Sequence, residues 1–232
     1  WETLRQVGSN LWMLIVLAIA SGAAASLLSP GRSPEFSWLT VFGSVVLALM
    51  TGVLAFNGEN RRRTQRFLLQ HGARPGVVWA VKVGTWWLVM VGLCAIAFTP
   101  VWLTMPLKAF ENKPPFLSLA SVVFWGLAGL TIAFALGVVC GMTFRRGIMA
   151  GMIALVLSLA LSIILGSTLQ AQILFPWHWP YLAAALVVVG WAWSGDWMYD
   201  SPGWQRWGRL AAYAAGVPVI LAPAYIAGRV WS

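Results

Sequence analysis

Charged residues are scarce in this chain of 232 residues: they make up 9% of it, whereas 60% of its residues are hydrophobic. Soluble domains carry roughly a quarter of their residues as charge. A soluble enzyme and a disordered chain are therefore excluded. Mean hydropathy is +0.79, and a bilayer offers the matching solvent, in which one helical span needs about 20 apolar residues.

Cysteine and histidine are also scarce, with two of each. Cys94 and Cys140 lie inside apolar runs, which excludes a disulfide-built secreted domain, and we interpret both as small core residues. His71 and His178 fall in loops predicted on opposite sides of the membrane, so they cannot share a metal. No serine–histidine or paired-carboxylate arrangement is evident. The sequence therefore predicts no catalytic residue, no metal site and no cofactor held by this chain.

Seven long apolar runs predict the fold class: an all-α, polytopic membrane bundle with six transmembrane helices and a seventh beyond them. The runs cover residues 11–28, 38–56, 83–103, 119–143, 147–165, 181–193 and 210–227. The sixth is short, and the seventh contains Pro218 and Pro223.

Basic residues set the orientation. The net charge is 15 − 6 = +9. With the N-terminus in the cytoplasm, eleven basic residues fall on the inner side and four, namely Arg32, Lys108, Lys113 and Arg229, on the outer side. This asymmetry predicts a cytoplasmic N-terminus. The surplus of basic residues then sets the topology, aided by anionic lipid at the inner face of the membrane. A nucleic-acid partner is unnecessary to explain it.

The predicted runs contain no Asp, Glu, Lys, Arg or His, which argues against a proton- or sodium-coupled carrier. Their polar side chains are mild and are expected to bond back to their own helices; they are Thr85, Thr99, Ser121, Thr131, Ser158 and Ser162. Two glycine pairs with small-xxx-small spacing predict close helix packing; they are Gly137 with Gly141 and Gly147 with Gly151.

The most informative stretch is the polar segment 57–82. A short cytoplasmic helix is expected over residues 59–70, with Asn57 as its N-cap and Gly72 as its stop. Phe67, Leu68 and Leu69 form an apolar patch, and arginines cover the rest. From the residues alone, this helix is either an interfacial anchor on anionic lipid or a docking element for a cytoplasmic partner.

The same segment resembles the signature region of type-2 ATP-binding-cassette (ABC) permeases. That pattern has a span ending in Phe, then Gly-Glu-Arg-x-x-Gly-Thr-x-x-x-Leu-Leu, a Leu-Pro turn, a basic residue and a Lys entering the next span. The matching residues, in order, are Phe56, Gly58, Glu59, Thr64, Phe67, Leu68, Leu69, Arg74 and Lys82. The opening residues Trp1, Leu4 and Arg5 also resemble the amphipathic start of such permeases. Arg63 and the His71–Gly72 pair depart from the pattern.

The resemblance implies a transmembrane permease subunit of an ATP-driven exporter in a cell inner membrane. Its partners would be cytoplasmic ABC ATPase subunits, which would bind ATP and Mg, and a second permease copy or half. The chain itself has no G-x-x-x-x-G-K-[ST] phosphate loop. Uncharged runs suit an amphiphilic or hydrophobic substrate. The residues implied in ATPase docking are Glu59, Arg62, Thr64, Arg66, Phe67, Leu68 and Leu69.

The expected domain organisation is a six-helix permease unit over residues 1–194, with 57–82 as its coupling segment. Residues 195–232 would be a cytoplasmic Trp-rich loop and an additional transmembrane helix leading to further polypeptide.

Alternatives from other classes stay open. An integral membrane enzyme acting on lipid would depend on Glu35, Glu111, Asp196 and Asp200. An ion-coupled carrier would move its substrate without any ATPase. A non-transporting scaffold or sensor would bind an ATPase through residues 67–69 and move nothing.

Overall fold

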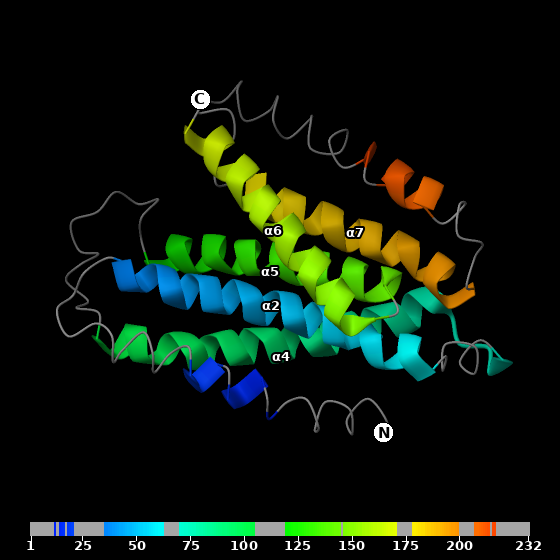
Figure 1. Ribbon diagram of the computed structural model, residues 1–232, viewed down its shortest axis with the longest axis horizontal. Helices are drawn as coiled ribbons and strands as arrows, with labels where there is room; N and C mark the ends of the chain where they lie inside the picture. The colour runs from blue at the N-terminus through cyan, green and yellow to red at the C-terminus, as the bar shows by residue number, and fades with distance from the viewer. Residues whose placement is uncertain are drawn as a thin grey trace.

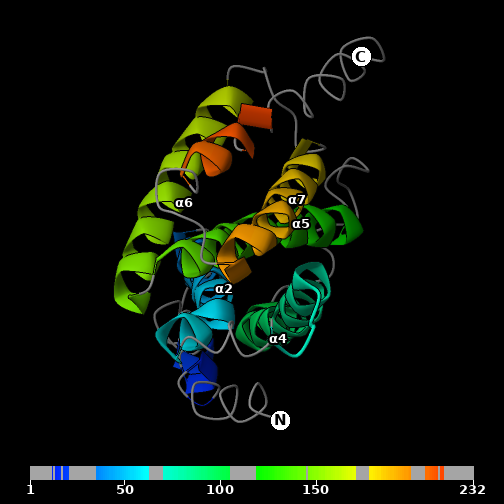
Figure 2. The same ribbon diagram turned by 90° about the vertical axis from the view of Figure 1, so that its right-hand side faces the viewer.

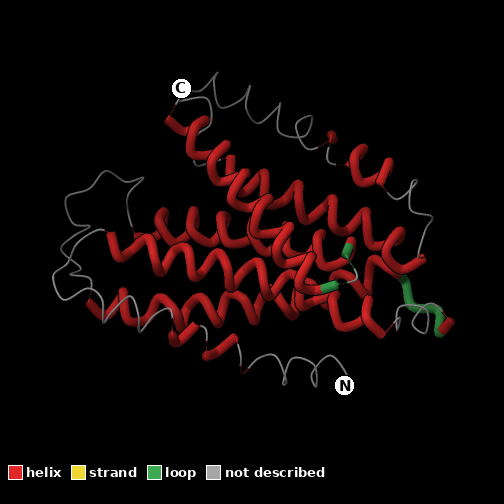
Figure 3. The backbone as a smooth tube through the Cα atoms, viewed as in Figure 1, coloured by secondary structure: helices red, strands yellow, loops and turns green. Residues whose placement is uncertain are grey.

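The computed structural model describes residues 12, 14–16, 18–20, 35–62, 70–104, 119–144, 146–170, 178–199, 207–213 and 215–216. Every regular element within these ranges is a helix. The five long ones are α2 (Glu35–Arg62), α4 (Pro75–Thr104), α5 (Leu119–Thr143), α6 (Gly147–Gln170) and α7 (His178–Tyr199). Figures 1 and 3 show them as a bundle of long helices joined at their ends.

Among the described residues, three helices are long and apolar enough to cross a membrane. Their apolar spans are Pro75–Thr99 in α4, Val123–Thr143 in α5 and Gly147–Ile164 in α6. A shorter apolar stretch, Val41–Asn57, lies in α2. The predicted all-α membrane class is confirmed at this level, whereas a total of six or seven spans stays a prediction. Most of the first and seventh predicted runs lies outside the described residues.

Helix boundaries differ from the predicted runs where charged residues lie inside a helix: α2 runs from Glu35 to Arg62, beyond both ends of the predicted run 38–56, and α4 and α7 differ in the same way. α4 begins at Pro75, so Lys82 belongs to it. α7 continues to Tyr199, so Asp196 belongs to it and the expected domain boundary at 194/195 falls inside a helix. The expectation of a loop from residue 195 is wrong for residues 195–199, because a single polar residue in an apolar stretch does not end a helix.

The centre of the bundle is the contact between α2 and α5. Added Cβ atoms at Gly52 and Gly137 would overlap backbone of the facing helix, at Phe134 O and Leu49 O respectively. A Cβ at Gly141 would lie 2.7 Å from the carbonyl oxygen of Val53. These glycines therefore let the two backbones touch, which is how helices approach closely in a membrane. Figure 1 shows α2 lying between α5 and α4.

The helix α6 packs on this pair through small residues. Ala150 and Ala154 are fully buried, and Ser158 is buried one turn further along. A Cβ at Gly151 would lie 3.3 Å from Cε of Met50 in α2. Most of the other described side chains of α6 are exposed. Only 22% of its apolar stretch is buried, against 44% in α5. Figure 2 shows α6 at the edge of the bundle.

Four of the six polar side chains that were predicted to bond back to their own helices do so, and Ser121 and Ser158 stay predictions. The hydroxyls of Thr85, Thr99, Thr131 and Ser162 donate to the carbonyl four residues earlier at 2.8 Å in each case. One of them also serves a neighbouring helix, because the indole N–H of Trp87 in α4 donates to Thr131 Oγ1 in α5 at 3.2 Å.

Candidate functional site

The candidate site is the end of the bundle where α2 ends and α4 begins. The helix α2 continues through Asn57 to Arg62 without a break. The prediction that Asn57 caps a separate helix is therefore wrong, since Asn57 lies inside α2. Its side chain instead lies against the first residue of α6: a Cβ on Gly147 would overlap the Asn57 amide. The root of the segment thus contacts α6.

The segment returns to the bundle at a turn. Gly72 has φ 73°, the left-handed conformation in which helices commonly end. Its predicted role as the stop of a helix over residues 59–70 stays a prediction, because residues 63–69 lie outside the described residues. The amides of Val77 and Val78 both donate to the carbonyl of Arg74 at 3.1 Å. Pro75 stands at the first position of α4, where no amide hydrogen is needed. Figure 3 shows this turn as a loop leading into α4.

Three aromatic and cationic groups meet at the base of the segment. Phe56, in the last turns of α2, is fully buried. Its ring contacts Trp197 of α7 edge to face, with centroids 5.0 Å apart. The Lys82 ammonium of α4 lies 5.6 Å from the same ring centroid, in cation–π range. Phe56 therefore joins α2 to both α4 and α7.

A partly buried ion pair lies one residue from Trp197. The carboxylate of Asp196 is 4% exposed and accepts a hydrogen bond from Arg209 Nη1 at 2.7 Å, while Arg209 is 56% exposed. The helical stretch 207–213 carries this arginine back to α7. Trp207 packs on Phe144, at the end of α5, with ring centroids 6.1 Å apart. Residues 207–213 therefore bridge the ends of α5 and α7.

The predicted docking residues are only partly visible. Glu59 and Arg62 lie in the last turns of α2, and the structure describes their backbone alone. Thr64, Arg66, Phe67, Leu68 and Leu69 lie outside the described residues. The apolar anchor of the predicted docking helix therefore stays a prediction.

The structure places Lys82, Asp196 and Arg209 at the end of the bundle where α2 ends and α4 begins. Sequence reasoning gave Lys82 to the permease pattern, Asp196 to the enzyme alternative and Arg209 to the basic residues of the inner side, and it did not relate the three. No proline lies between residues 181 and 199, and this was the available signal that α7 continues past residue 193.

Of the four acidic residues on which the enzyme alternative depends, the structure describes the side chain of Asp196 alone. Asp196 is buried and paired with Arg209. Glu35 begins α2 with its side chain undescribed, and Glu111 and Asp200 lie outside the described residues. Within the described part of the chain, no three His, Cys, Asp or Glu side chains are grouped so that they could hold a metal ion.

Comparison of the chain with protein-family models, with curated proteins and with solved structures gives no match.

Proposed function

We propose that this protein is the transmembrane permease subunit of an ATP-driven exporter, coupled to separate cytoplasmic ATPase subunits through the segment between α2 and α4. The observation that carries the proposal is Phe56. It lies where the type-2 ABC permease pattern has the span-ending phenylalanine, and its buried ring joins α2 to α7 and to Lys82 of α4. A force applied to the segment would therefore reach three helices at once.

The proposed mechanism follows from these contacts. Closure of an ATPase dimer would displace the docking helix carrying Phe67, Leu68 and Leu69. Because α2 is unbroken as far as Arg62, this displacement would tilt α2 rather than bend it. Phe56 would transmit the tilt to Trp197 in α7. Two such bundles would then expose a path between them alternately to either side of the membrane.

The proposed substrate is an amphiphilic or hydrophobic molecule. Lys82 and Asp196 belong to helices, but both lie near one end of the bundle, beside Phe56 and Trp197. Between them and the opposite ends, the described stretches of α4, α5, α6 and α7 contain no Asp, Glu, Lys or Arg. A path lined by such helices suits an apolar substrate better than a bare ion.

The test is a double substitution, Phe67→Asp with Leu68→Asp, in a tagged chain purified with its ATPase. We expect the ATPase, identified by its phosphate-loop sequence, to co-purify with the natural chain and to be lost from the variant, because charge replaces the buried anchor. The matched control is Gln70→Asp, which adds charge to the exposed Gln70 of the same segment and should retain the ATPase. An intact complex with the double variant contradicts the docking assignment.

Orientation is tested separately by introducing a cysteine at Gln70 and labelling whole cells with a membrane-impermeant maleimide. The two native cysteines are buried, so the background is low. We expect no labelling until the cells are opened. Labelling in intact cells would place the segment outside and would end the proposal.

A further inference from the structure

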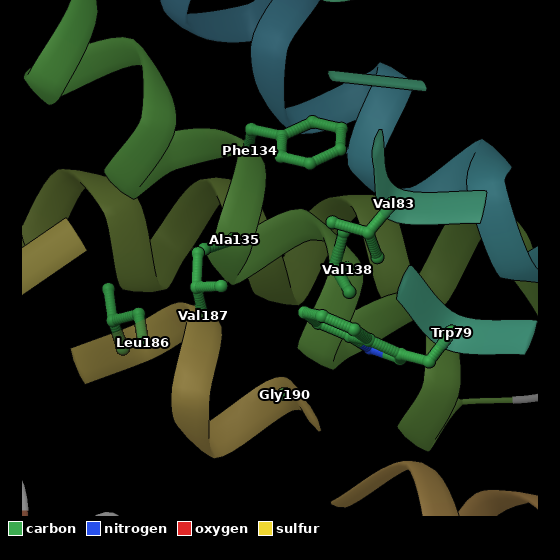
Figure 4. A pocket seen from close by; sticks show the side chains of 8 residues that line it. All are labelled: Trp79, Val83, Phe134, Ala135, Val138, Leu186, Val187 and Gly190. Atoms are coloured by element: carbon green, nitrogen blue, oxygen red, sulfur yellow. The ribbon is translucent and has the colours of Figure 1, made fainter. Parts of the chain in front are cut away.

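The space between α4, α5 and α7 leaves no room for a ligand. About 10 Å³ stays empty beside Trp79, which admits one water molecule at most. Figure 4 shows the Trp79 ring between Val138 of α5 and Gly190 of α7, and a Cβ on Gly190 would lie 3.1 Å from Cζ2 of Trp79. The same helices make a second such contact, where a Cβ on Gly76 of α4 would lie 2.8 Å from Nε1 of Trp191 in α7. Tryptophan packed on glycine therefore closes this part of the interior, in contrast to the outer surface of α6.

Two basic segments meet where α5 ends and α6 begins. The ring of Phe144 contacts the ring of Trp207, with centroids 6.1 Å apart. Arg146 lies two residues after Phe144, and Arg209 lies two residues after Trp207. Both arginines are exposed. A cytoplasmic N-terminus explains basic residues on one side of a membrane, but it does not require two basic segments in contact.

Carboxylates do not neutralise these two segments. Asp196 accepts a hydrogen bond from Arg209 Nη1 at 2.7 Å, but Arg209 stays 56% exposed. A guanidinium has five N–H donors, so part of Arg209 remains open to an anion. The two segments and the end of α7 hold four arginines and two aspartates, namely Arg145, Arg146, Arg206, Arg209, Asp196 and Asp200. The excess of 4 − 2 = +2 favours an anionic ligand.

An apolar ridge begins beside Arg146 and follows the outer face of α6. Its residues are three or four positions apart, so they lie on one face of the helix. Each of them is at least 57% exposed; they are Ile148, Met152, Val156, Leu159 and Ile163. The surface of α6 is therefore apolar along its length and basic at its beginning.

We propose that the beginning of α6 binds an anionic phospholipid of the adjoining leaflet, with its phosphate at Arg146 and Arg209 and an acyl chain along the apolar ridge. Arginine binds phosphate through charge-assisted hydrogen bonds, and basic surfaces at helix ends hold anionic headgroups. The half-exposed Trp207 suits the headgroup zone. A soluble anion would leave the ridge uncovered, whereas a phospholipid matches both the charge and the apolar surface. The proposal goes beyond the transport function and does not depend on it.

The test uses nanodiscs in which a small fraction of the lipid is either phosphatidylglycerol or phosphatidylcholine, each with the same diazirine-bearing acyl chain. After photolysis, mass spectrometry measures the labelling of the peptide that contains Ile148 and Met152. The quantity compared is the ratio of labelling by phosphatidylglycerol to labelling by phosphatidylcholine. We expect a ratio of at least about fivefold in the natural chain, the preference that one arginine near a membrane surface gives.

Charge at the two arginines should govern the ratio. Arg146→Gln should lower it about fivefold, whereas Arg146→Lys should retain it because the positive charge remains. Arg209→Gln should lower the ratio as well, and Arg209→Lys, which keeps a cation for Asp196, separates the loss of charge from the loss of the arginine itself. The matched control is Arg74→Gln: Arg74 is also exposed but precedes α4, so the ratio should stay close to its natural value.

Equal labelling by both lipids in the natural chain would overturn the proposal, as would a ratio that Arg146→Gln leaves unchanged. Millimolar inorganic phosphate should not alter the ratio, because it cannot cover the apolar ridge. Complete competition by phosphate would assign the arginines to a soluble anion and would overturn the proposal. Equal labelling combined with loss of a co-purified ATPase from Arg146→Gln would assign them to a protein partner instead.

Discussion

The helix pair α2–α5 and the helix α6 show opposite ways of packing in one bundle. Between α2 and α5, three glycines bring backbone against backbone, and an added methyl group has no space. On α6, large apolar side chains such as Ile148 (81% exposed) and Met152 (65% exposed) face outward. The helices α5 and α6 are similarly apolar in sequence, so hydrophobicity does not distinguish their positions.

Residue size distinguishes them instead. In a membrane, apolar surface gains nothing by leaving lipid for protein, and helices associate where small residues allow close contact. The glycines at positions 52, 137 and 141 supply that contact along one face of each helix. The helix α6 has small residues on one narrow stripe, including Ala150 and Ala154, and large ones elsewhere.

The largest effect is expected for Gly137→Ala. Its new methyl group would overlap the carbonyl oxygen of Leu49, and backbone atoms cannot rotate away as side chains do. We expect a loss of about 3 kcal/mol in the free energy of unfolding, measured by detergent-induced unfolding in mixed micelles. Gly126→Ala on the same helix is the control, because nothing lies within 4 Å of its added Cβ. Equal effects at the two positions would show that helix propensity, and not contact, governs α5.

The next effect is expected at the ion pair that joins α7 to residues 207–213. Arg209→Gln removes the charge that faces the buried carboxylate of Asp196, and we expect a loss of about 1–2 kcal/mol, reduced by the exposure of Arg209. Arg74→Gln, an exposed arginine that begins the α4 turn, should change stability by less than about 0.5 kcal/mol. The same unfolding titration measures both. No difference between them would mean that the pair contributes nothing to the fold.

A smaller effect is expected where α6 begins. Gly147→Ala pushes its methyl group into the Asn57 amide, a side chain that can move. We expect a loss of about 1 kcal/mol. In the double variant with Asn57→Ala the two changes should compensate in part, so that the combined loss falls below the sum of the single losses. Strict additivity would show that Asn57 and Gly147 do not interact.

The smallest effect is expected on the outer face of α6. Val156→Leu, at a residue that is 65% exposed, should change the free energy of unfolding by less than about 0.5 kcal/mol in micelles. A loss above about 1 kcal/mol would reveal that α6 packs against a further surface.

The fold class was predictable because it depends on long apolar runs, which are visible in the sequence without any knowledge of contacts. Predicted and observed helix limits coincide for α5, at Leu119 and Thr143. They differ for α4 and α7, where Lys82 and Asp196 interrupt the apolar pattern without interrupting the helix. A charged residue ends a hydropathy run at once, whereas a helix ends only when its backbone must turn, as at Gly72.

The base of the candidate site could not be predicted for a related reason. Phe56, Lys82 and Trp197 come from three helices, and no spacing in the sequence relates them. Arg209 pairs with Asp196 only because residues 207–213 return to α7. The position of Gly72 was predictable because left-handed turns depend on local residue identity. Contacts between helices depend on which helix faces meet. Because 60% of the residues are hydrophobic, many helix faces have the same apolar character, and the sequence does not show which of them pack together.

The interlocked backbones of α2 and α5 restrict how this bundle can rearrange. Neither helix can rotate or slide past the other unless the carbonyl oxygens of Leu49, Val53 and Phe134 move away from the glycines that face them, so α2 and α5 move as one rigid unit. Any change of shape must then come from movement of α4, α6 and α7 relative to this unit. Such movement would first strain the contacts of Phe56 with Trp197 and Lys82, and the two contacts in which a tryptophan of α4 or α7 packs on a glycine of the other helix.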